Sequence, residues 1–251
     1  SANKDIFINQ QITLTGSGSK VQLNSGNSSA SSSIVFAGAV SSDILSIDVT
    51  GSGTISQSAA IQANNLRINA TTTDVTLTNA SNNFGSLATN TRSLAILSNQ
   101  GIDLGSIYGS GTYINTIGDV AGVTATGTIG IRTTNSNLFV AQNITTSSTS
   151  SDALIINAGS SLSPGTYYGG SNSNNPYGPN IVLTNGRSIT IGSGGTGKLY
   201  SGGFANSGVE LASYLGANKS RYNSNETSQA FSTALGIGLT AIYRQNPNLT
   251  I

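Results

Sequence analysis

Carboxylates are the main candidates for chemistry in this sequence, because it contains no histidine and no cysteine, the usual side chains for proton transfer and nucleophilic attack. Asp43 and Asp48 are close in sequence. Asp103 and Asp119 could meet on successive turns of a coiled chain, with Arg132 beyond them. Paired acids with Ca²⁺ and a basic residue would suit a polysaccharide lyase or hydrolase. Turn formation explains the same aspartates, so we predict no catalytic residue, no cofactor and no metal ligand.

A glycine-rich stretch, residues 192–198, is the second candidate for chemistry, because backbone N–H groups in such a loop can hold a phosphate. A phosphate loop needs Ser or Thr directly after its lysine and a helix to follow. Here Leu199 follows Lys198, and no helical pattern comes next. The stretch is therefore predicted to be a turn in which glycine permits positive φ angles.

Three tyrosines are the best candidates for contact with a ligand. Tyr167, Tyr168 and Tyr177 occur in a stretch rich in Gly, Asn and Ser, and tyrosine offers a rigid surface on which a sugar can stack. The alternative is that the rings fold back and cover an exposed face of the protein.

The charge of the chain argues against nucleic acid as a partner. Only 8% of residues are charged and the net charge is +1, without a basic cluster of the kind that phosphate backbones require. No apolar run is long enough to enter a membrane, so we predict no membrane insertion by this segment. The first residues lack the apolar stretch of a signal peptide, so export information either lies outside this segment or was removed. Met is absent altogether, including at position 1, which suggests a piece of a longer protein.

The apolar residues favour an all-β protein. Isoleucine is the most frequent of the large aliphatic residues and threonine is abundant, and both fit a pleated surface better than a helix. Short apolar runs bounded by Gly, Asn or Ser predict strands. These runs are residues 5–8, 34–36, 44–49, 66–68, 75–78, 94–97, 123–125, 129–131, 138–140, 154–156, 181–183 and 189–191.

The spacing of the runs favours a right-handed parallel β-solenoid, or β-helix. Val75, Leu94 and Tyr113 begin stretches that are 19 residues apart, close to the periods of repeat architectures. Each coil would place a strand about 4.8 Å above the preceding one. A β-sandwich is the competing architecture, but a sandwich with free edges usually carries more protective charge than this chain has.

The chain is predicted to consist of a solenoid stalk and a terminating part. The stalk covers residues 1–200 and carries an irregular extruded loop at about 160–180. Residues 201–251 form a cap or linker that leads to a following module, and residues 209–215 within it are the one place where a short helix is plausible.

Three sequence phrases carry a resemblance to a known family. The first is VTLTNASNNFG at 75–85, followed by GIDLG at 101–105. The second runs from LIINAG at 154–159, through 180–183 and 189–195, to LYSG at 199–202. The third is RYN at 221–223, followed by 234–239 and by AIYRQNP at 241–247.

These phrases resemble the filamentous haemagglutinin-type adhesins that Gram-negative bacteria export by two-partner secretion, near the end of their filamentous region. They cover roughly residues 74–251, and Gln245 stands where family members often have an acidic residue. The resemblance implies a β-solenoid, secretion to the bacterial cell surface through an outer-membrane secretion partner, and adhesion through a glycan or protein receptor on a host or neighbouring cell.

The expected function is therefore that of a non-enzymatic structural and adhesive segment, which mediates attachment to cells, surfaces or a biofilm matrix. Two alternatives remain at this point. One is a carbohydrate-active enzyme on the same fold, with clustered carboxylates in a cleft. The other is an ice- or mineral-binding solenoid, which needs a flat, regular array of threonines. The threonines at 71–73 and 145–146 are irregularly placed for such an array.

Overall fold

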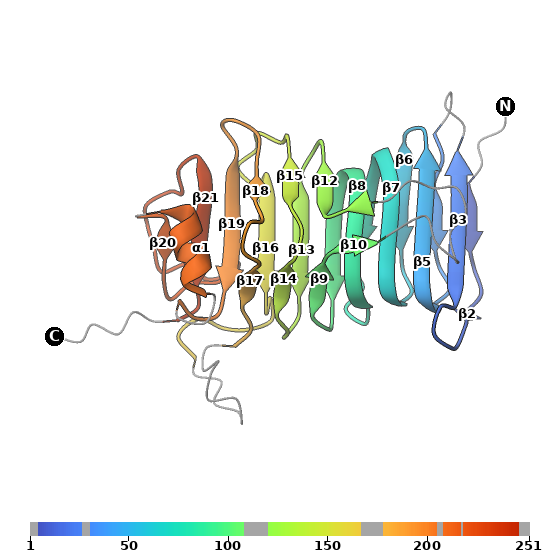
Figure 1. Cartoon of the computed structure of the whole chain (residues 1–251), viewed down its shortest axis with the longest axis horizontal. Coiled ribbons are helices and arrows are strands. Elements are labelled where there is room, and N and C mark those ends of the chain that lie inside the picture. Colours follow the sequence, from blue (N-terminus) through green and yellow to red (C-terminus); the bar gives the residue numbers. More distant parts are fainter. Residues whose placement is uncertain are drawn as a thin grey trace.

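The computed structural model shows one long stack of β-strands (Figure 1). It describes residues 5–26, 31–107, 120–166, 178–204, 208–216 and 218–245. Nineteen strands join in one sheet through parallel pairings. The only antiparallel pair in these ranges joins β10 (Ser106–Ile107) to β11 (Val120–Ala121). This arrangement confirms the predicted all-β parallel β-solenoid and excludes the β-sandwich. Parallel crossovers are right-handed in about 98% of cases, so right-handed winding stays our expectation.

The first row of strands runs along the whole stack. Its nine rungs are β1 (Ile6–Ile8), β4 (Ile34–Phe36), β6 (Gly53–Gln57), the ends of β7 (Ile61–Leu77) and β8 (Asn83–Ser98), β13 (Ile129–Thr133), β16 (Leu154–Ala158), β19 (Thr196–Ser201) and β21 (Gly238–Tyr243). Eight spacings of about 4.8 Å make this row roughly 38 Å long.

Two further rows complete the coils. The second contains β2 (Ile12–Thr13) and the beginnings of β5 (Val40–Thr50), β7 and β8. The third contains β3 (Lys20–Gly26), the rest of β5, the middle parts of β7 and β8, β12 (Val123–Ala125), β15 (Ile144–Thr146) and β18 (Ile189–Thr190). Strands β9 (Ile102–Leu104), β14 (Leu138–Val140) and β17 (Ile181–Leu183) pair in that order, and β9 also pairs with β8.

Alternate side chains of each strand point into the stack and form its core. In the first row, one inward column is formed by Ile34, Ile55, Val75, Leu94 and Ile129. Each of these residues is paired with the next, and each is at most 2% exposed. The third row contributes a column of three fully buried leucines, at positions 45, 66 and 87. Each coil therefore buries its apolar side chains against the coils next to it.

Every strand predicted from the sequence overlaps an observed strand. The sequence did not predict β2, β3, β6, β9, β10, β11, β15, β19, β20 (Ser220–Arg221) or β21. In β3, β6 and β15 the reason is that Asn, Ser, Gln or Thr alternates with a few apolar residues. The predicted 19-residue step is correct for Val75 and Leu94, which are paired in register. The next step is wrong, because Leu94 pairs on its other side with Ile129 and not with Tyr113. Tyr113 itself lies outside the described residues.

The C-terminal part contains the one helix in the described ranges, α1 (Gly208–Leu215), which confirms the helix predicted at 209–215. Strand β21 continues the first row beyond β19, and β20 (Ser220–Arg221) pairs with β21 (Figure 1). The division of the chain at residue 200 stays a prediction. The regular first row nevertheless extends to Tyr243 within the described residues.

Glycines at several corners bring the backbones of neighbouring coils close together. Gly122 has a φ of 70°, and a Cβ added there would overlap the carbonyl oxygen of Asn143 in the next coil. Gly186 has a similar φ of 77°, but nothing lies within 4 Å of its Cβ position. The two sites therefore separate the effect of backbone strain from that of a steric overlap.

We expect Gly186→Ala to lower the free energy of unfolding by about 1 kcal/mol, from strain alone. Gly122→Ala adds the overlap with the Asn143 carbonyl and should cost about 2–3 kcal/mol. Denaturant unfolding of the two variants measures the difference. Equal losses would show that the coils can separate at this corner without cost.

Candidate ligand-binding groove

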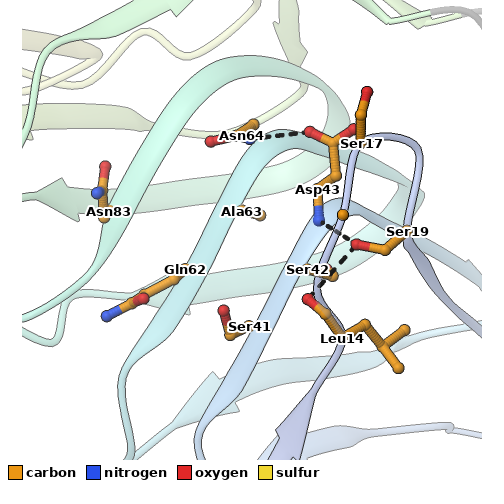
Figure 2. Close-up of a pocket in the computed structure, with 11 residues that line it drawn as sticks. Leu14, Ser17, Ser19, Ser41, Ser42, Asp43, Gln62, Ala63, Asn64 and Asn83 are labelled. Atoms are coloured by element: carbon orange, nitrogen blue, oxygen red, sulfur yellow. Dashed lines mark hydrogen bonds between the residues drawn. The ribbon is translucent and has the colours of Figure 1, made fainter.

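A polar groove lies at the corner between the second and third rows, near the N-terminal end of the stack (Figure 2). Its volume is about 400 Å³, which falls in the range of roughly 300–1,000 Å³ that is typical of ligand clefts. The loop between β2 and β3 forms one wall, and β5, β7 and β8 supply the rest. The lining residues are Leu14, Gly16, Ser17, Ser19, Ser41, Ser42, Asp43, Gln62, Ala63, Asn64 and Asn83.

Asp43 is the one acid among the lining residues, and it is held from two sides. The Gly18 N–H donates to one carboxylate oxygen at 2.5 Å, and the Asn64 amide donates to the other at 2.9 Å. These donors hold the pKa of the Asp43 carboxyl below its usual value, with the Gly18 bond as the larger cause and slight burial opposing it. Asp43 is therefore ionised at neutral pH. The Asp43 N–H also donates to the Ser19 hydroxyl at 3.1 Å, which ties the loop to β5.

Two sets of residues are stacked across the groove at intervals of 21 residues. Ser41, Gln62 and Asn83 are paired in register on successive coils. Asp43 and Asn64 form the second set, and Gly85 takes the next position, where a Cβ would lie 2.7 Å from the Asn64 carbonyl oxygen. Glycine at position 85 therefore lets its backbone lie close to that of Asn64 in the preceding coil.

Hydrogen-bonding groups line most of the groove. The side chains of Ser41, Gln62 and Asn83 make no hydrogen bond within the described parts of the chain. Hydroxyls and side-chain amides both donate and accept, whereas ionised Asp43 only accepts. The groove can therefore bind a ligand that carries many hydroxyl groups. Glycoside hydrolysis normally needs two carboxyl groups about 5–9.5 Å apart, and the groove offers one.

The structure does not bring the other predicted acids into this groove. Asp48 accepts two hydrogen bonds from Arg67, at 2.9 and 3.0 Å. Asp103 lies on β9, where partial burial raises the pKa of its carboxyl. Asp119 lies outside the described residues. In the parts of the chain that the structure describes, no group of three or more Asp, Glu, His or Cys side chains is placed to hold a metal ion.

Arg132 is paired with an acid that the sequence did not suggest. Glu226 accepts hydrogen bonds from the Arg132 guanidinium and from the Asn157 amide, the latter at 2.9 Å. Glu226 belongs to a segment between β20 and β21, residues 222–237, which we call the strap. Asn157 occupies an outward position on β16 but is only 1% exposed. The strap therefore lies against the outer face of the first row.

The pair makes the attachment of the strap depend on pH. Burial alone would raise the pKa of Glu226, but hydrogen bonds from Arg132 and Asn157 outweigh it and bring the pKa below the usual 4.5. A lowered folded-state pKa gives stability that is present above 4.5 and is lost as the pH falls through the folded value. Glu226→Gln should therefore lower the free energy of unfolding at neutral pH, and lower it less at pH values well below 4.5. Equal losses at both pH values, measured by denaturant unfolding, would contradict the role of the Glu226 charge.

The three candidate tyrosines, Tyr167, Tyr168 and Tyr177, lie outside the described residues, so their predicted ligand contact stays a prediction. Both ends of the predicted loop that carries them are described. The Arg244 guanidinium is 1% exposed and donates to the carbonyl oxygen of Gly159, at 3.4 Å, and to that of Pro179, at 2.5 Å. One buried side chain thus joins the two ends of this loop.

Residues 192–195 of the glycine-rich stretch form a turn, as predicted, whereas residues 196–198 already belong to β19. The Gly195 N–H donates to the Gly192 carbonyl at 2.9 Å, and Gly194 has a φ of 94°. Strand β19 follows directly, and Lys198 on that strand forms an ion pair with Asp152 at 2.5 Å. A strand follows the turn where a phosphate loop would have its helix.

Asp43 was predicted from the sequence as a candidate acid, but most of the residues around it were not. The signal that could have found them is the 21-residue interval, which relates Ser41 to Gln62 and Asn83 and also relates Asp43 to Asn64. Arg244 could not be recognised in this way, because its partners, Gly159 and Pro179, lie at the two ends of a loop and are not related to Arg244 by the 21-residue interval.

Among the described residues, no helix has the length and apolar character needed to cross a membrane. In comparisons with known proteins, no protein family, no curated protein and no solved structure matches this chain.

Proposed function

We propose that this chain is a non-enzymatic structural and adhesive segment of a large secreted bacterial surface protein. The observation that carries the proposal is the uninterrupted stack of nine rungs in the first row, in which each coil pairs with its neighbours. A stack of this kind lengthens with every added coil, which suits a protein that must hold a contact surface away from a cell.

The composition of the exterior supports an adhesive role. In the third row, one outward column consists of Asn24, Asp48, Asn69, Asn90, Thr124, Thr145 and Thr190, each paired with the next. Six of these seven side chains are neutral hydrogen-bonding groups. Such a surface can bind glycans or proteins without a strong dependence on salt.

Secretion, surface location and an outer-membrane secretion partner belong to the same proposal and rest on the resemblance of residues 74–251 to filamentous haemagglutinin-type adhesins. The receptor would be a glycan or a protein on a host or neighbouring cell. A stack without disulfides also fits such export, because coils can fold one after another outside the cell.

Beads test the adhesive role directly. We would coat beads with the folded chain and measure how many remain on layers of epithelial cells, and on bacterial biofilm, under flow. Beads carrying the same density of urea-unfolded chain are the matched control. The proposal predicts that more beads with the folded chain than with the unfolded chain are retained. If folded and unfolded chain gave equal retention on cells and also on biofilm, the proposal would be contradicted.

A second assay tests the non-enzymatic part. The chain would be incubated with Ca²⁺ and with neutral and acidic polysaccharides, and newly formed chain ends would be measured. We expect none above the level of a boiled sample. New chain ends would contradict the proposal and would favour a carbohydrate-active enzyme.

A further inference from the structure

We propose that the groove around Asp43 is a binding site for a neutral polysaccharide, whose chain lies along the axis of the stack. This inference rests on the proposed adhesive function and names the ligand class of one site.

The lining residues favour a ligand that repeats along the stack. Ser41, Gln62 and Asn83 occupy equivalent positions on three successive coils, at intervals of about 4.8 Å. Figure 2 shows their side chains arranged across neighbouring strands, with Asp43 and Asn64 at the adjacent corner. A polymer that extends across the coils can give a hydroxyl group to each of them. A compact ligand would reach only some of these three side chains.

The polarity of the groove favours carbohydrate over an apolar ligand. Leu14 and Ala63 are the only lining residues with apolar side chains, and the lining contains no aromatic ring. A ligand must therefore exchange its hydrogen bonds to water for bonds to hydroxyls, amides and one carboxylate. Polyhydroxylated chains can make that exchange along their whole length.

The charge of the groove favours neutral over acidic chains. Asp43 is the one charged residue among those that line it, and no cation lies among them to offset its field. Uronate or sulfate groups would be repelled at the same place where the hydroxyl groups of a neutral chain can donate to Asp43. Hydrogen bonds to an ionised acceptor are roughly twice as strong as neutral ones.

The partners of Asp43 also argue against a cation site. Each of its carboxylate oxygens already accepts an N–H donor, from Gly18 or from Asn64. Ca²⁺ needs six to eight oxygen ligands, whereas these N–H dipoles direct positive charge at both oxygens. The remaining lone pairs on the carboxylate suit hydroxyl donors from a ligand.

The experiment measures the affinity of the full chain for four probes by calorimetry. Cellohexaose, maltohexaose and chitohexaose are the neutral probes, and hexagalacturonate is the acidic one. We expect at least one neutral probe to bind, and hexagalacturonate to bind about tenfold more weakly or worse. Failure of all three neutral probes to bind would overturn the proposal, and so would equal affinity for the acidic probe.

Two pairs of variants locate the site. Asp43→Asn should weaken the affinity for the neutral probe about tenfold or more. Asp152→Asn is its control, because it removes the same charge from a distant exposed ion pair, and it should change the affinity by less than about twofold. Gln62→Ala with Asn83→Ala should also weaken binding. Thr124→Ala with Thr145→Ala is its control on an exposed part of the third row. Equal effects within either pair would overturn the assignment to this groove.

The bead assay separates this inference from the proposed function. If beads carrying the unchanged chain are retained on cells while no neutral hexasaccharide binds, the groove assignment is overturned and the adhesive role stands. If a neutral hexasaccharide binds and Asp43→Asn abolishes that binding, the groove assignment is supported, whether or not the beads are retained.

Discussion

Replacing Asp48 with alanine is expected to lower the free energy of unfolding by about 3–5 kcal/mol. Its partner Arg67 is fully buried, and the variant leaves that guanidinium without its carboxylate. Breaking a buried ion pair by removing one member is costly, because the remaining charge keeps its desolvation penalty. Burial raises the pKa of the Asp48 carboxyl, and the hydrogen bond and charge of the Arg67 guanidinium oppose that shift.

The second ion pair on β7 provides the matched control. Asp74 pairs with Arg92, but both side chains are more than 40% exposed, against 0% for Arg67 and 14% for Asp48. Asp74→Ala should therefore cost at most about 1 kcal/mol. Denaturant unfolding of Asp48→Ala and Asp74→Ala measures the two losses in the free energy of unfolding. Similar losses would mean that water reaches Arg67.

A double-mutant cycle separates the charge from the packing. Asp48→Ala combined with Arg67→Ala removes both charges, so its loss of stability should be smaller than the sum of the two single losses. Strictly additive losses would indicate that Asp48 and Arg67 act independently.

The burial of Arg67 also shows a limit of sequence reasoning. Arg67 lies at an outward position of β7, between Ser46 and Ala88 in the neighbouring rungs. Alternation along the strand predicts that such a side chain faces water. The antiparallel pair β10–β11 instead lies against β7 and β8, and Val120 of β11 packs on Ala88. A sequence does not reveal that an excursion from one coil returns to cover another.

The fold itself could be predicted because its signals are local. Short β-branched runs with turn residues at their ends locate the strands, and stacking requires only that these runs recur. The coil lengths could not be predicted from one interval. The inward residues of one column of the first row, from Ile34 through Val75 and Ile129 to Leu154, are separated by unequal stretches of chain, because loops at the corners absorb the difference.

The candidate site was predictable only in part, for a related reason. Asp43 is recognisable as an acid in a polar context, but a groove depends on which residues share a corner. That depends on the 21-residue interval between Asp43, Asn64 and Gly85, whereas the first row uses intervals of 20 and 19 residues between Ile55, Val75 and Leu94. A single period taken from one row therefore misplaces the residues of another.

The phrase at 75–85, which carries part of the family resemblance, has a structural explanation in its asparagines. Asn82 is fully buried, and its side-chain oxygen accepts from the Gln57 amide at 2.8 Å and from the Ile61 N–H at 2.9 Å. Its side-chain amide donates back to Gln57 at 2.8 Å and to the carbonyl oxygens of Leu77 and Leu97 at 3.1 and 3.2 Å. One asparagine thus joins the backbone of its own coil to the coils before and after it.

We therefore expect Asn82→Ala to lower the free energy of unfolding by about 3–5 kcal/mol. Three backbone groups, on Ile61, Leu77 and Leu97, lose their buried partner, and each such loss costs about 1–3 kcal/mol. Aspartate at this position would accept from Ile61 but could not donate to the two carbonyls, so Asn82→Asp should be no better tolerated than alanine.

Asn79→Ala is the control, because it removes the same side chain three positions earlier in the same turn. Asn79 also spans two coils, donating to the Ser58 carbonyl at 2.8 Å and accepting from the Ser81 N–H at 2.9 Å, but both bonds are exposed to water. Water can replace them, so the loss should be about 1 kcal/mol or less. Denaturant unfolding distinguishes the two variants. If Asn79→Ala were as damaging as Asn82→Ala, stability at this turn would depend on the local turn conformation, and the buried bridge between coils would not explain the phrase.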